Sequence, residues 1–130
     1  MFGAYVAEVV TVSLTANGYK VDKVVAVVDC GRVINRSGAE AQISGGIMDG
    51  LSAAMHQAIH IADGRTRESN FSDYRLLRID EALEIEVHFI DSALAPEGLG
   101  EAALPVAAPA LCNALYAATG KRIRKLPIAL

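Results

Sequence analysis

The hydrophobic pattern of the first thirty residues predicts two paired β-strands. Val-rich stretches at Phe2–Thr15 and Tyr19–Asp29 flank the turn residues Ala16-Asn17-Gly18, an arrangement typical of a β-hairpin. The run Val24–Val28 is apolar at every position, as expected of an interior strand that is covered on both faces.

Two helices are predicted downstream of the hairpin. Apolar residues recur at three- and four-residue intervals between Ile43 and Ile59, which predicts a helix from about Ala39 to Ile61. Pro105–Thr119 is Ala-rich and almost uniformly apolar, and Gly120 stands where a C-terminal cap belongs. This second segment predicts a buried helix.

The region between the helices contains a turn at Asp63-Gly64, a stretch at Glu84–Ile90 in which charged and apolar residues alternate, and a loop over Asp91–Gly100. The alternation predicts a strand with one solvent-facing side. The expected fold is therefore α+β, with antiparallel strands packed against two main helices in a single domain over residues 1–130.

Composition and charge narrow the possible partners. The chain is 52% hydrophobic but only 5% aromatic, so a domain of this size is expected to have part of its surface covered by another molecule. Fifteen acidic and 12 basic residues give a net charge of −3, which argues against binding to nucleic acid or to a membrane. Because no signal peptide or membrane-spanning run is visible, a cytoplasmic location is expected.

Glu101 is a candidate catalytic base. It ends the sequence Gly98-Leu99-Gly100-Glu101 and precedes an apolar segment, so the glycines let the backbone approach a ligand and place a carboxylate at the edge of an apolar element. The pattern alone is weak, because a Gly-rich turn that ends in a surface glutamate is common.

Gln42 opens a glycine-rich part of the first helix, which contains Gly45, Gly46 and Gly50. Each glycine in a helix costs roughly 1 kcal/mol relative to alanine, so a bare backbone must serve some purpose there. Either another helix packs closely across it, or a ligand lies against the helix start, where free N–H groups favour anions such as phosphate.

His56 and His60 are four residues apart and would share one face of the predicted helix. This spacing is found in metal sites, but Gln57 replaces the glutamate of an HExxH motif and no third ligand is evident. We therefore interpret the pair as part of a solvated helix face and predict no metal ligands in this chain.

Four segments in order resemble the large, molybdopterin-binding subunit of xanthine oxidase-type molybdenum hydroxylases. They are VVAVVDCGRVIN, AEAQISGGIMDGLSAAM, ESNFSDYRLLR and GLGEAALPVAAPALCNALYAATGKRIRKLP. The resemblance covers nearly the whole chain and is strongest to the isoquinoline 1-oxidoreductase and aldehyde oxidoreductase branch. It implies a C-terminal, molybdenum-cofactor-binding-domain-like fold from a larger oxidoreductase subunit.

The resemblance also implies a site. Glu101 matches the family's catalytic base, Gln42 matches a glutamine near the metal, and Gly100 matches the residue beside the metal centre. Gly45, in the same block as Gln42, completes the expected cofactor-binding set. The implied cofactor is molybdenum with molybdopterin cytosine dinucleotide, and the implied reaction is oxidation of an aldehyde or N-heterocycle with water-derived oxygen.

Three positions depart from the family pattern. Arg36 and Ala102 replace prolines, and Ser44 replaces a glutamate. None of these changes removes a catalytic atom, but Ala102 relaxes the backbone next to Glu101.

Family large subunits are several times longer than this chain, so the expected partners are the rest of the large subunit and a 2Fe–2S subunit. Alone, the chain is expected to be inactive and to bind no cofactor. The alternative is a non-catalytic folded module that forms a homo-oligomer.

Overall fold

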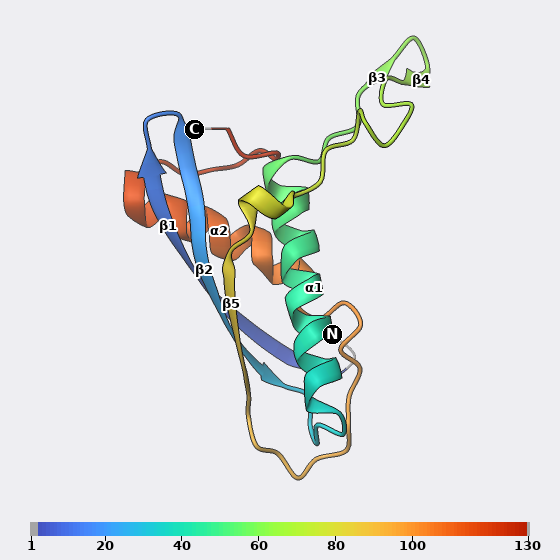
Figure 1. Ribbon diagram of the computed structural model, residues 1–130, viewed down its shortest axis with the longest axis vertical. Coiled ribbons are helices and arrows are strands. Elements are labelled where there is room, and N and C mark those ends of the chain that lie inside the picture. Colours follow the sequence, from blue (N-terminus) through green and yellow to red (C-terminus); the bar gives the residue numbers. More distant parts are fainter. Residues whose placement is uncertain (1–2, 130) are drawn as a thin grey trace.

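The computed structural model describes residues 3–129 and contains a three-stranded sheet with two helices on one of its faces (Figure 1). The strands are β1 (Tyr5–Thr15), β2 (Gly18–Asp29) and β5 (Glu84–Phe89), in the order β1-β2-β5. The predicted hairpin is confirmed, since β1 and β2 pair in antiparallel fashion, with a register shift between Thr11 and Val12. Phe2, which was included in the predicted first strand, lies outside the described residues.

The α+β class is confirmed, but the sheet is mixed rather than antiparallel throughout. β5 pairs with β2 in parallel, for example Ala26 with Val87. A parallel neighbour requires a crossover connection, and the long helix between β2 and β5 supplies it. Periodicity within each strand could not reveal this direction.

The two helices are α1 (Arg36–Met55) and α2 (Leu104–Thr119). Asn35 caps α1, because its side-chain oxygen accepts a hydrogen bond from the Gly38 N–H at 3.0 Å. α2 ends as predicted at Gly120, which adopts a left-handed conformation with φ of 71°. α2 packs on both α1 and β1, while α1 also contacts β5.

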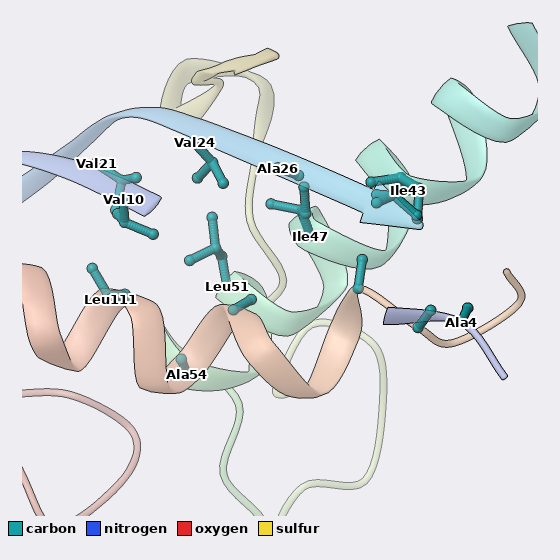
Figure 2. Packing of buried hydrophobic residues seen from close by; sticks show 14 of the residues in the cluster. Ala4, Val10, Val21, Val24, Ala26, Ile43, Ile47, Leu51, Ala54 and Leu111 are labelled. Carbon is teal, nitrogen blue, oxygen red and sulfur yellow. The ribbon is translucent and has the colours of Figure 1, made fainter. Parts of the chain in front are cut away.

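The core lies between the helices and the inner face of the sheet. Aliphatic side chains from β2, α1 and α2 point toward one another there (Figure 2), and burial of each such side chain contributes about 1.5–3 kcal/mol. The largest fully buried ones are Ile43, Ile47, Leu51, Leu111, Leu115, Val24 and Val28.

Within residues 3–129 the opposite face of the sheet is not covered. Tyr5 is 75% exposed, Val9 68% and Val27 39%. The prediction that Val24–Val28 is buried on both faces is therefore wrong for this chain, although β2 is the central strand.

The first helix ends earlier than predicted, at Met55 rather than near Ile61. The backbone N–H of Ile128 donates to the Ala54 carbonyl at 2.8 Å, and the Leu77 N–H donates to the Ser52 hydroxyl at 2.9 Å. These distant segments occupy the end of α1, so the apolar spacing beyond it does not continue as helix.

The chain between α1 and β5 forms an arm that projects from the body (Figure 1). It carries a small hairpin of β3 (Ile61–Ala62) and β4 (Arg65–Thr66), followed by a 3-10 turn at Ile79–Glu81. The predicted Asp63-Gly64 turn is confirmed, because both residues have positive φ, 53° and 73°. No helix in the described part of the chain is long and apolar enough to cross a membrane.

The glycines of α1 allow a close crossing with α2. A Cβ on Gly50 would lie 2.5 Å from the Leu104 carbonyl oxygen and 2.7 Å from the Ala107 Cβ. A Cβ on Gly46 would lie 3.3 Å from the Ala103 Cβ. Helix packing, the first of the two interpretations left open by the sequence, therefore accounts for these two glycines.

We predict that Gly50→Ala destabilises the fold by about 1–3 kcal/mol, because the added methyl group overpacks the helix crossing. Gly45→Ala is the matched control: no described neighbour outside its own helix lies within 4 Å of its Cβ position, so it should be neutral or up to about 1 kcal/mol stabilising. Urea unfolding of the two variants measures the difference. Equal stabilities would show that the crossing is not close.

Glu8 is an acidic residue of β1 that lies on the same strand face as Val6, which packs against the core, and Val10, which belongs to it. Its two carboxylate oxygens are buried, and no described residue donates a hydrogen bond to them. Burial raises the pKa of this carboxyl from 4.5 to about 7, since the charged form loses its hydration.

This shift predicts that the free energy of unfolding decreases as pH rises from about 4.5 to 7 and is constant above, because the folded state binds the proton more tightly than the unfolded state. Partial exposure of the residue reduces the effect to about 1–2 kcal/mol. Denaturant unfolding across this pH range, with Glu8→Gln as control, tests the prediction. A wild-type minus variant difference that is independent of pH would contradict it.

Candidate functional site

The candidate site lies where the first turns of α1 meet the loop between β5 and α2. The Gln42 Nε2 atom donates a hydrogen bond to the Gly100 carbonyl at 2.8 Å, across 58 residues of sequence. The structure therefore brings together two of the predicted site residues and places both next to Glu101.

Glu101 lies between this hydrogen bond and the start of α2. Its side chain is exposed, while Ala102 and Ala103 directly after it are 8% and 1% exposed. The backbone on one side of Glu101 is thus held by Gln42 and on the other by the core. This arrangement fixes where the carboxylate emerges and leaves it accessible from outside the chain.

Two glycines of the predicted site have open space beside them. Within the described part of the chain, nothing lies within 4 Å of a Cβ built on Gly45 or on Gly100, apart from their immediate chain neighbours and, for Gly45, its own helix. Gly45, one turn after Gln42, is exposed. Unlike Gly46 and Gly50, these two glycines are not explained by packing within this chain.

A cleft of about 360 Å³ opens beside the same loop. Its polar walls include Asn35, Gln42 and Glu97, and its apolar walls include Cys30 and Leu99. Sequence reasoning did not single out Asn35 or Glu97 as cleft residues. Asn35 caps α1, which begins at Arg36 rather than at about Ala39 as predicted.

His56 and His60 lie away from this cleft and are not brought together. Both were predicted to lie in the first helix, but α1 ends at Met55, before either of them. Instead, His56 Nε2 is 2.9 Å from Glu81 Oε1, and His60 Nδ1 is 2.6 Å from Glu68 Oε1. Hydrogen bonds from His60 lower the pKa of Glu68 to about 2, with the larger effect from its backbone N–H and the smaller one from its ring. Among residues 3–129, no three His, Cys, Asp or Glu side chains gather as a metal site.

Comparison with known proteins identifies the chain. Residues 1–83 match the family model of the molybdopterin cofactor-binding domain. The chain is 36% identical over 106 residues to the membrane-bound aldehyde dehydrogenase (pyrroloquinoline-quinone) of Gluconacetobacter polyoxogenes, covering 82% of this chain and 14% of that protein. It is also 36% identical over 112 residues to isoquinoline 1-oxidoreductase subunit beta of Brevundimonas diminuta, covering 86% and 14%.

The fold agrees with the sequence match. The crystal structure of the aldehyde oxidoreductase from Desulfovibrio desulfuricans superposes with a TM-score of 0.81 at 26% identity, over 95% of this chain and 14% of that one. The chain belongs to the molybdopterin cofactor-binding domain family of the xanthine oxidase-type molybdenum hydroxylases, as its sequence predicted. It spans about one seventh of the length of these relatives.

Proposed function

We propose that this chain forms one wall of the cofactor site of a molybdenum hydroxylase and that Glu101 is its catalytic base. The observation that supports this most directly is the Gln42–Gly100 hydrogen bond, which joins the two cofactor-facing segments beside an exposed carboxylate. The relatives named for aldehydes and for isoquinoline support an aldehyde or an N-heterocycle as the substrate class.

The residues present fit such a cofactor as a partial cradle. Gly45 and Gly100 leave room for close approach of a flat ligand, because a Cβ at either position would project into the open space. Gln42 keeps its side-chain oxygen and a second N–H for contacts beyond Gly100. When bound, molybdopterin would supply the molybdenum that takes up electrons from the substrate.

The contribution of this chain to the reaction is the control of a proton. A base must lie within hydrogen-bond reach of the proton that it removes, and the anchored backbone on both sides of Glu101 holds its carboxylate in one region. Gln42 acts on the same region by fixing the Gly100 carbonyl. The exposed Glu101 carboxylate is then free to accept a proton from the water-derived oxygen as that oxygen attacks the substrate carbon.

The other walls of the site are proposed to come from the rest of the large subunit, with a 2Fe–2S subunit as electron acceptor. Two cysteines in 130 residues cannot bind an iron–sulfur cluster that needs four. The cytosine dinucleotide form of molybdopterin is proposed for the complete enzyme, following the isoquinoline 1-oxidoreductase and aldehyde oxidoreductase branch.

We predict that Glu101→Gln in the assembled enzyme lowers kcat by about 10²–10⁴-fold at unchanged molybdenum content, because the amide keeps the shape of the side chain but cannot accept the proton. Asp91→Asn, at an exposed carboxylate at the start of the same loop, is the control and should keep the wild-type rate. Steady-state kinetics and metal analysis of each variant measure both quantities. A Glu101→Gln enzyme within twofold of wild type would refute the proposed role.

For the chain purified alone we predict no bound molybdenum and self-association, because one wall cannot hold a dinucleotide cofactor and the apolar outer face of the sheet is exposed. Elemental analysis and sedimentation at high micromolar concentration test the two parts. Self-association without activity in any assembly would favour the alternative of a non-catalytic folded module. Stoichiometric molybdenum in the isolated chain would contradict the division of the site between chains.

A further inference from the structure

We infer that the turn Cys30–Arg32, which follows β2, positions the loop that carries Glu101. Within this turn, Gly31 is the positioning residue, because its bare backbone lets the loop approach. The inference rests on the proposed function of Glu101. It concerns a turn that lies 70 residues before Glu101 in the sequence and lines the same cleft as Gln42.

Two backbone hydrogen bonds fasten the loop to this turn. The Arg32 N–H donates to the Leu94 carbonyl at 3.0 Å, and the Glu97 N–H donates to the Cys30 carbonyl at 2.8 Å. The bonds flank Gly31 on both sides, so the loop lies along the backbone of the turn like a short added strand.

Between these two bonds the loop touches Gly31 itself. A Cβ on Gly31 would lie 2.0 Å from the Ala95 carbonyl oxygen and 2.8 Å from its carbonyl carbon. Both atoms belong to the backbone, so no side-chain rotation can relieve the overlap. Any residue other than glycine must push the loop away from the turn.

The turn is itself held in shape. Gly31 has φ of 68°, in the left-handed region that favours glycine, and its N–H donates to the Asp29 Oδ1 atom at 3.2 Å. Just upstream, the Val28 carbonyl accepts the Ile90 N–H at 2.9 Å. The central strand and its exit therefore fix the start and the middle of the loop.

The remaining freedom of the loop is small. Gln42 holds Gly100 and the core holds Ala102, so Gly98 and Leu99 alone separate the anchor at Glu97 from the one at Gly100. If the turn releases the loop, the backbone hydrogen bonds that remain are those of Ile90 at its start and Gly100 at its end, while Leu99 still packs against the core. A displacement of about 1 Å at a reacting group can reduce a rate by 10²-fold, so this turn bears directly on the position of Glu101.

Gly31→Ala tests the inference, first in the chain itself. We expect hydrogen exchange at the Arg32 and Glu97 amides to accelerate at least tenfold, while the amides of the β1–β2 hairpin keep their protection. Gly64→Ala is the matched control, because Gly64 has a similar φ of 73° but no described neighbour within 4 Å of its Cβ position. It carries the same backbone strain without the contact. Unchanged exchange at Arg32 and Glu97 in Gly31→Ala would overturn the inference.

In the assembled enzyme, Gly31→Ala should lower kcat at least tenfold relative to Gly64→Ala at equal molybdenum content, with a smaller change in KM. If Gly31→Ala does not fold, Asp29→Ala loosens the same turn without a steric overlap and should change exchange and kcat in the same direction. A released loop with a wild-type rate would refute the positioning role while leaving Glu101 as base. A Glu101→Gln enzyme with full activity would instead remove the proposed function.

Discussion

The geometry of the site depends on the close crossing of α1 and α2. Because Gly50 has no side chain, the Leu104 carbonyl can approach to within 2.5 Å of the place where a Cβ would stand, and the first turn of α2 is pressed against α1. This contact buries Ala103 and fixes the chain direction just before the helix. About two turns earlier on α1, Gln42 is then within hydrogen-bond reach of Gly100. A packing constraint in the core thus places a polar contact at the surface.

The parts of the fold that local chemistry determines could be predicted from the sequence. The turn at Asp63-Gly64 and the helix end at Gly120 each require positive φ, which these residue types tolerate, and the structure has both. The hairpin followed from two Val-rich stretches around turn residues, and the strand with one solvent-facing side followed from a period-two pattern. Family resemblance, rather than periodicity, was needed to select Glu101 and Gln42, since neither residue is distinctive in its local sequence.

Features that depend on distant segments could not be predicted. The end of α1 is set by Ile128 and Leu77, which lie 74 and 25 residues away from their partners in the helix. The parallel direction of β5 depends on the path of the crossover connection, and an alternating pattern is the same for a parallel and an antiparallel strand. The helix glycines posed a true choice between packing and ligand contact, and the structure divides them: Gly50 packs, whereas Gly45 faces open space.

The exposure of Glu101 bears on its proposed role as a base. Electrostatic and proton-transfer effects are strongest where water is excluded, yet Glu101 is exposed in this chain. By contrast, burial raises the pKa of Glu8 to about 7, since no described residue donates a hydrogen bond to its carboxylate. In the proposed role, the chain would provide position through the backbone anchors on both sides of Glu101, whereas exclusion of water would have to come from surfaces that cover the cleft. The relatives are about seven times longer, so the proposed source of that cover is the remainder of a large subunit, and the exposed apolar outer face of the sheet is a second surface that it could contact.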